Sequence, residues 1–110
     1  MRIISGKFKT RLIKTPSNNS IRPTSDRARE MIFNTLNSLL IKDKKKITGQ
    51  AIIDCFCGTG ALGIEALSRG AEHVTFIDSS NESLNLCRKN CQELKICLLY
   101  TSDAADDRMR

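Results

Sequence analysis

The sequence of 110 residues lacks any apolar run that approaches the length of about eighteen residues typical of a membrane span. Residues 1–7 also lack the apolar core of a signal peptide. These two absences argue against a membrane-spanning or secreted protein, and we expect a cytoplasmic one. A chain of this length forms one small domain at most, and we expect it to be a piece of something larger.

Histidine is scarce and paired cysteines are missing, which argues against a metal site. His73 is the single histidine, and no two cysteines have the CxxC spacing. Since zinc sites are typically built from such pairs, we predict that the chain binds no metal. We expect the five cysteines to be small buried hydrophobic residues in a reducing compartment; they are Cys55, Cys57, Cys87, Cys91 and Cys97.

Positive charge is concentrated at the beginning of the chain. Residues 1–30 contain eight Lys or Arg and two Asp or Glu, so they carry 8 − 2 = +6, which equals the net charge of the whole chain. Clustered cations gain affinity for a polyanion by releasing counterions from its phosphates. The segment therefore predicts either a nucleic-acid-binding surface or a solubilising face, and charge alone leaves both open.

The most informative stretch is residues 52–63, where an apolar run ends in Asp54 and passes into the sequence GTGALG at 58–63. We expect Asp54 at the carboxyl end of a strand. Gly58 and Gly60 would form a sharp turn that brings the backbone close to a ligand. A helix that begins at about Ala61 would direct its amino end at the same crevice, as in a nucleotide-cofactor loop.

The order of the predicted elements indicates an α/β fold. A helix capped by Thr24 or Ser25 is expected from residue 26 to about 41. Its predicted apolar stripe consists of Ala28, Met31, Ile32, Leu36, Leu39 and Leu40. Strands at 51–55 and 73–77 alternate with a helix at 61–69, which predicts a right-handed βαβ unit and the start of a doubly wound parallel sheet.

Two further segments complete this prediction. A last helix opens near Ser79 or Ser80, and its apolar stripe consists of Leu84, Cys87, Cys91 and Leu94. Residues 2–14 alternate weakly and carry basic groups, so they fit a short hairpin or an extended arm better than a helix.

Two acids beside the glycine loop help to choose between cofactors. The loop also satisfies the dinucleotide pattern GxGxxG, and Asp78 lies near the place where an acid holds a ribose hydroxyl. The Asp54 carboxylate would repel a pyrophosphate but attract the cationic sulfonium and amino groups of S-adenosylmethionine. We therefore favour S-adenosylmethionine over a nicotinamide cofactor. Each acid, taken alone, is also compatible with a capping or turn role without a ligand.

Three segments resemble the RsmD-type 16S ribosomal RNA guanine-N2 methyltransferases. They are residues 2–9 (RIISGKFK), 22–34 (RPTSDRAREMIFN) and 54–71 (DCFCGTGALGIEALSRGA). The likeness extends to about Lys95. The second segment is the most specific, because few other methyltransferases combine a basic arm and an RPT-type turn with this glycine loop.

The resemblance implies a Rossmann-like, S-adenosylmethionine-dependent methyltransferase fold, truncated, with a basic amino-terminal arm. It implies methylation of the exocyclic N2 of a guanine in 16S rRNA or the small ribosomal subunit, by an intact enzyme expected to be monomeric. The residues that it implies at the cofactor are Thr24, Arg27, Glu30, Asp54, Phe56, Gly58, Gly60 and Asp78. Those that it implies at the RNA are Arg2, Lys7, Lys9, Arg11 and Arg22.

Two departures from the family limit what this chain alone can do. The family's catalytic signature, an Asn or Asp followed by two prolines and an aromatic residue, is missing, since the only prolines are Pro16 and Pro23. We therefore expect the chain alone to be inactive. From Ile96 the sequence resembles the in-frame translation of a transposase-type sequencing adapter. The expected parts are a basic arm and turn (1–25), the first part of the methyltransferase domain (26–95) and a non-native tail (96–110).

Two other classes stay open on the sequence alone. A NAD-binding oxidoreductase fragment would use the same glycine loop, and it predicts a change in NADH fluorescence on mixing. A noncatalytic basic RNA-binding module would use only the arm, and it predicts an RNA affinity that depends on Lys7, Lys9 and Arg11.

Overall fold

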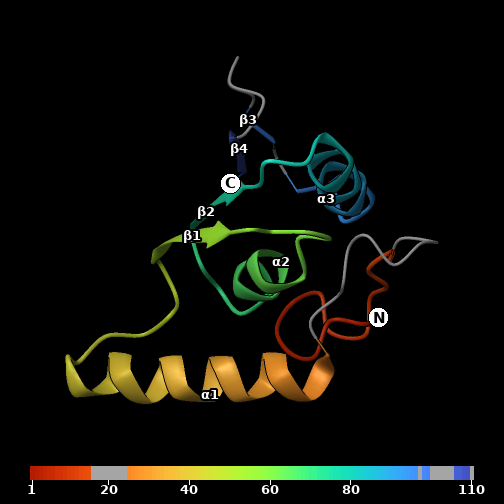
Figure 1. Cartoon of the computed structure of the whole chain (residues 1–110). Helices are drawn as coiled ribbons and strands as arrows, with labels where there is room; N and C mark the ends of the chain where they lie inside the picture. The colour runs from red at the N-terminus through yellow and green to blue at the C-terminus, as the bar shows by residue number, and fades with distance from the viewer. Residues whose placement is uncertain (16–24, 97, 100–105, 110) are drawn as a thin grey trace.

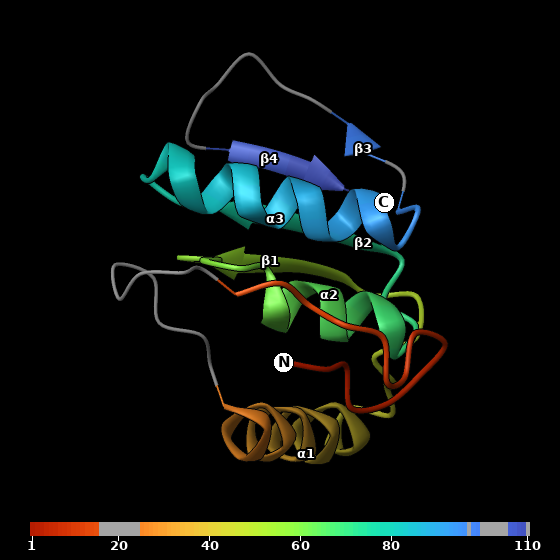
Figure 2. The same cartoon turned by 90° about the vertical axis from the view of Figure 1, so that its right-hand side faces the viewer.

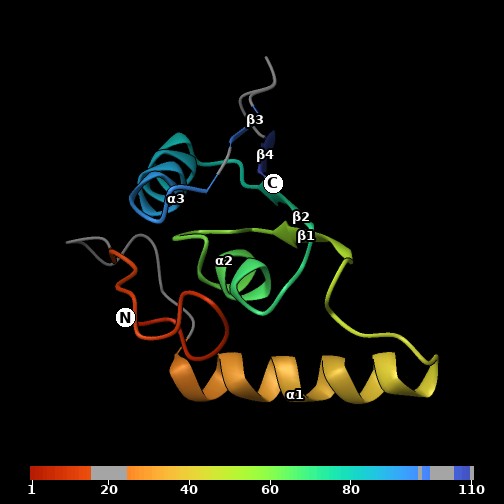
Figure 3. The ribbon, with the colours of Figure 1, turned by 180° about the vertical axis from the view of Figure 1, so that it is seen from behind.

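The computed structural model describes residues 1–15, 25–96, 98–99 and 106–109. Its helices are α1 (Asp26–Lys42), α2 (Ala61–Ser68) and α3 (Asn81–Glu93), and its strands are β1 (Ala51–Cys55), β2 (His73–Ile77), β3 (Leu98–Leu99) and β4 (Asp106–Met109). Helix α2 lies between β1 and α1 in all three views (Figures 1, 2 and 3). This layered arrangement of helices on a sheet confirms the predicted α/β class.

The sheet has the strand order β1-β2-β4-β3. Strands β1 and β2 pair in parallel, from Ala51 opposite His73 to Cys55 opposite Ile77, and both have the predicted bounds. Strand β4 is antiparallel to β2, and β3 is antiparallel to β4. The predicted parallel pairing of β1 and β2 is therefore confirmed, whereas β3 and β4 lie in residues 96–110, the segment predicted to be a non-native tail. The carboxyl ends of the parallel pair position the glycine loop.

Helix α2 packs directly on the sheet because it contains Gly63. A Cβ atom at this position would lie 2.4 Å from the ring of Phe76 in β2, too close for any side chain. The helix ends one residue before the predicted end, with Arg69 as its C-cap and Gly70 at φ +111°. The third glycine of the loop pattern thus serves helix-to-strand packing, as in nucleotide-binding βαβ units.

The helix α1 is confirmed, but its predicted apolar stripe is confirmed only in part. Leu36 and Leu40 are partly buried against the core. The side that faces the protein buries Arg29 and Phe33, whereas Met31 and Leu39 are 61% and 55% exposed. The periodicity was misleading because it assigns every charged residue to the exposed side of the helix. Arg29 is instead buried, because it forms an ion pair with Glu65 in α2. Ser25 caps the helix by accepting from the Ala28 N–H.

Helix α3 follows its prediction. Ser80 is its N-cap, and its Oγ accepts from the Ser83 N–H. The predicted stripe of Leu84, Cys87, Cys91 and Leu94 is buried.

The cysteines agree with the prediction of burial at three positions, Cys57, Cys87 and Cys91. Cys55 is exposed, contrary to that expectation, because it follows Ala51 and Ile53 on the open face of β1, at one edge of the described sheet. Cys97 lies outside the described residues. No cluster of metal-ligating side chains occurs in the part of the chain that the structure describes.

The basic arm folds back on itself as a short hairpin, one of the two predicted forms. Arg2 and Leu12 form an antiparallel bridge, and Ile3 and Ile13 are buried in the core. The arm (red in Figure 2) runs beside α2 and α1. The arm is therefore a packed part of the domain. Across the described ranges, no helix is long and apolar enough to cross a membrane.

Candidate cofactor-binding loop

The loop between β1 and α2 turns sharply through residues with positive φ. Phe56, Gly58 and Gly60 have φ values of +60°, +55° and +85°. A Cβ at Gly60 would lie 2.6 Å from Cys87 Sγ, so this position requires glycine both for its backbone and for its packing. The Gly60 N–H donates to the Cys57 carbonyl at 2.8 Å and closes the turn. The sequence correctly predicted a sharp glycine turn here.

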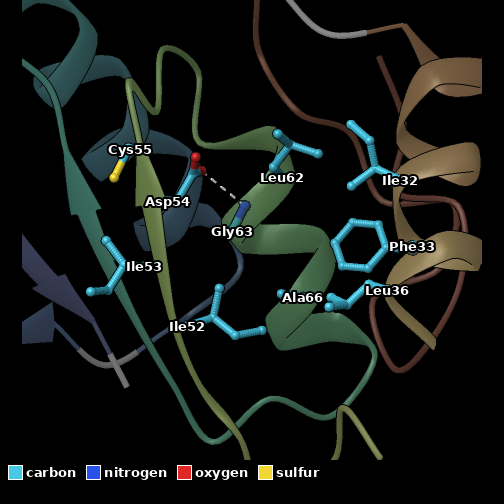
Figure 4. Close-up of a pocket in the computed structure, with 10 residues that line it drawn as sticks. All are labelled: Ile32, Phe33, Leu36, Ile52, Ile53, Asp54, Cys55, Leu62, Gly63 and Ala66. Atoms are coloured by element: carbon cyan, nitrogen blue, oxygen red, sulfur yellow. Dashed lines mark hydrogen bonds between the residues drawn. The ribbon is translucent and has the colours of Figure 1, made fainter. Parts of the chain in front are cut away.

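Asp54 lies where it was predicted, near the carboxyl end of β1, and is 7% exposed. Its Oδ2 accepts from the Gly63 N–H in the first turn of α2 at 3.0 Å (dashed line in Figure 4). Burial raises the pKa of Asp54 to about 6, the Gly63 hydrogen bond opposes this increase, and the negative charge of Asp78 adds to it. Within the described residues no Lys or Arg pairs with Asp54, so its charge is only partly compensated.

Asp78 braces the same loop from the end of β2. Its Oδ2 accepts from the Gly58 N–H at 3.0 Å, and its Oδ1 accepts from the Ser80 N–H at 2.9 Å. The second of these bonds lies at the start of α3, because Ser80 is the N-cap of that helix. The structure therefore brings Asp54, Asp78, Gly58 and Gly60 together at one end of the parallel strands, as predicted. It also gives Asp78 a structural role in the loop.

A groove of about 260 Å³ opens between α1, β1 and α2. Its walls are apolar except for Asp54 and consist of Ile32, Phe33, Leu36, Ile52, Ile53, Cys55, Leu62, Gly63 and Ala66 (Figure 4). The Asp54 side chain lies on the α2 side of β1 and points toward the first turn of α2. A carboxylate in such apolar surroundings interacts strongly with any cation that reaches it, because little water screens the charge.

The other residues implied at the cofactor are placed less directly. The Phe56 ring is 85% exposed on the loop. Arg27 and Glu30 are exposed on α1, and none of the contacts between described residues joins them to the loop. Thr24 and Arg22 lie outside the described residues.

The basic residues of the arm are exposed. Arg2, Lys7, Lys9 and Arg11 all belong to the folded hairpin. Arg2 donates to the Thr10 carbonyl at 2.8 Å, and Arg11 donates to the Glu93 carbonyl at the end of α3 at 3.3 Å. These two hydrogen bonds hold the Arg2 and Arg11 side chains against the surface of the domain, where both residues remain exposed to solvent.

Sequence reasoning missed a buried ion pair between Arg29 and Glu65. Both side chains are 0% exposed, and Arg29 Nη1 lies 3.3 Å from Glu65 Oε1. A signal for it was present, since Glu65 lies between Ile64 and Ala66 in a helix that is apolar on almost every side. An acid in such a helix requires a cationic partner.

Comparison with known proteins places this chain in a family. The family described as Conserved hypothetical protein 95 matches residues 1–109. The chain is 37% identical over 107 residues to the putative rRNA methyltransferase YlbH of Bacillus subtilis, covering 94% of this chain and 54% of that protein. It is 38% identical over 95 residues to ribosomal RNA small subunit methyltransferase D of Escherichia coli, covering 86% and 44%. The chain belongs to this methyltransferase family.

A solved structure of the family supports the fold. The putative methyltransferase yhhF from Escherichia coli matches with a TM-score of 0.70 and 39% sequence identity, over 86% of this chain and 48% of that one. This match confirms the Rossmann-like methyltransferase fold and the resemblance to RsmD-type enzymes. The chain spans about half the length of the curated relatives that it matches.

Proposed function

We propose that the complete protein to which this chain belongs methylates the exocyclic N2 of a guanine in small-subunit ribosomal RNA, with S-adenosylmethionine as methyl donor. Relatives named as rRNA methyltransferases support the reaction class. The single observation that carries the proposal is the partly compensated Asp54 beside a glycine turn, because it favours a cationic cofactor without phosphates.

The loop fits S-adenosylmethionine better than a dinucleotide. The pKa of Asp54 is raised to about 6 by burial, so the ionised carboxylate gains from any positive charge beside it. The cofactor's sulfonium and amino groups supply such charge, whereas a pyrophosphate would add two negative charges near Asp54 and Asp78. S-adenosylmethionine supplies the methyl group of its sulfonium when it is bound.

Each loop residue has a proposed part in holding the cofactor. Asp54, Gly58 and Gly60 border the space for its methionine end. Asp78 has further lone pairs besides the two that accept from the backbone, and these would accept from ribose hydroxyls. The exposed Phe56 ring offers an apolar contact surface, and Thr24, Arg27 and Glu30 are proposed to border the site on the α1 side.

The basic arm is proposed to contact RNA phosphates through Arg2, Lys7, Lys9, Arg11 and Arg22. Their charge is not balanced within residues 1–30, and the four described ones are exposed. The chain carries no Asx-Pro-Pro-aromatic motif. We therefore propose that residues 1–110 supply cofactor and RNA contacts but do not catalyse methyl transfer alone.

Isothermal titration with S-adenosylmethionine tests this function. The protein to be used is residues 1–95 continued by the carboxyl-terminal half of the Escherichia coli relative. We expect saturable binding and methylation of small-subunit rRNA. An absence of S-adenosylmethionine binding would overturn the proposal. A change in NADH fluorescence on adding the same protein would favour the oxidoreductase alternative.

A further inference from the structure

Glu65 holds the amino-terminal arm by hydrogen bonds to its backbone. Oε1 accepts from the Ile4 N–H at 2.9 Å, and Oε2 accepts from the Ser5 N–H at 3.1 Å. The two arginines that compensate its charge are Arg29, at 3.3 Å, and Arg69, whose Nε lies 2.9 Å from Oε2. The fully buried carboxylate thus receives four donors, and two of them belong to a segment 60 residues away in sequence.

The partner of Glu65 holds the same segment. Arg29 Nη2 donates to the Arg2 carbonyl at 2.9 Å and also pairs with Asp26. One arginine therefore bridges the acid in α2 to the arm and to the start of α1. Charged side chains therefore link all three segments.

A second set of contacts lies one turn further along α2. Ser68 Oγ donates to the Ser5 carbonyl at 2.6 Å and accepts from the Phe8 N–H at 3.0 Å, while the Lys7 N–H donates to the Ser68 carbonyl at 2.9 Å. This close approach depends on Gly6, because a Cβ there would lie 1.9 Å from the Ser68 carbonyl oxygen. The backbone of the arm is fitted to one face of α2.

We propose that Glu65 is a positioning residue which fixes the basic arm against α2, so that Lys7, Lys9 and Arg11 are presented as a rigid RNA-contacting surface. Such a surface binds more tightly than a free tail, since the arm loses less conformational entropy on contact with RNA. The RNA part of this inference rests on the proposed function. The attachment of the arm does not.

Glu65→Gln tests the attachment in the purified chain. A glutamine offers one carbonyl oxygen in place of two carboxylate oxygens, so its NH₂ group faces either the Ile4 or the Ser5 N–H. We expect the Ile4, Ser5, Lys7 and Phe8 amides to exchange hydrogen at least about tenfold faster, while Cys87 and Cys91 in α3 keep their protection. Unchanged exchange in the arm would overturn the proposal.

A pair of glycine variants tests the same attachment without altering the buried charges. Gly6→Ala forces a Cβ against Ser68. Gly49→Ala introduces the same residue at a similar φ, +82°, with nothing within 4 Å, and so controls for backbone strain. We expect fast exchange in the arm only for Gly6→Ala. Equal exchange in the two variants would contradict a fitted arm even if Glu65→Gln failed to fold.

Fluorescence anisotropy with a labelled transcript of small-subunit rRNA tests the purpose of the attachment. At low salt we expect Gly6→Ala to weaken binding about three- to tenfold relative to Gly49→Ala, with all cations retained. A released arm with unchanged RNA affinity would overturn the positioning role. If the unmodified chain bound no RNA, the proposed RNA contact would fail, while the exchange data would still decide the attachment.

Discussion

Two buried carboxylates, 11 residues apart in the sequence, have opposite surroundings. Glu65 is met by two arginines and two backbone N–H groups. Asp54 accepts a hydrogen bond from one backbone N–H and lies near a second acid, Asp78, and its pKa is raised to about 6. The charge of Glu65 is compensated within the fold, whereas that of Asp54 is only partly compensated among the described residues.

This difference separates a structural acid from a candidate ligand-binding acid. A buried charge without full compensation costs stability and persists where a ligand completes its surroundings. A fully paired one is difficult to remove but has no capacity left for a ligand. The surroundings of the two acids can therefore be compared by variants that we expect to change the free energy of unfolding in opposite directions.

The largest effect is expected on breaking the pair at Glu65. Arg29→Met removes the buried guanidinium and leaves Glu65 with Arg69 alone, so we expect a loss of about 3 to 5 kcal/mol in the free energy of unfolding. Urea denaturation measures it. The double variant Arg29→Met, Glu65→Gln should recover part of the loss, because the fully buried charge of Glu65 is then removed together with that of its partner. Additive losses in the double variant would show that the two residues are not coupled.

Removing the charge of Asp54 should have the opposite sign. The folded-state pKa is raised from 3.8 to about 6, so the stability associated with the protonated acid is fully present below about pH 4 and is lost as pH rises through 6. Asp54→Asn keeps an acceptor for Gly63 without this loss. We expect it to stabilise the ligand-free protein by up to about 3 kcal/mol at pH 7, and by little at pH 4.

Urea denaturation of both proteins at the two pH values checks this prediction. Destabilisation by Asp54→Asn at pH 7 would mean that the carboxylate is satisfied within the fold, and the contrast with Glu65 would disappear.

For Asp78 we expect a smaller effect, which is measured on cofactor binding. Asp78→Ala removes the charged acceptor beside the loop and should weaken S-adenosylmethionine binding by about 1 to 3 kcal/mol, measured by calorimetry on the completed protein. Ser80→Ala is the matched control, because it removes the cap of α3 and leaves the Gly58 contact intact. An equal dissociation constant in Asp78→Ala and the original protein would reduce Asp78 to a turn residue.

The sequence predicted local structure well where one rule acted alone. The bounds of β1 and β2, the N-cap Ser80 and the glycine turn each follow from a short pattern of apolar, capping or glycine residues. The inward face of α1 and the attachment of the arm did not follow, because both depend on a pair of charges 36 residues apart. A rule that assigns every charged residue to the surface cannot predict such a pair. The pair can be predicted only by considering which cationic partner compensates the charge of an acid in a buried helix.

The most direct test of the central claim is the pH dependence of S-adenosylmethionine affinity, measured by calorimetry on the completed protein and its Asp54→Asn variant. If Asp54 is the acid left for a cationic ligand, the affinity of the original protein rises as pH increases from about 5 to 7, and protons are released on binding below about pH 6. The Asn variant binds more weakly at pH 7 and shows no such rise. Equal affinities with the same pH profile in both proteins would contradict the account.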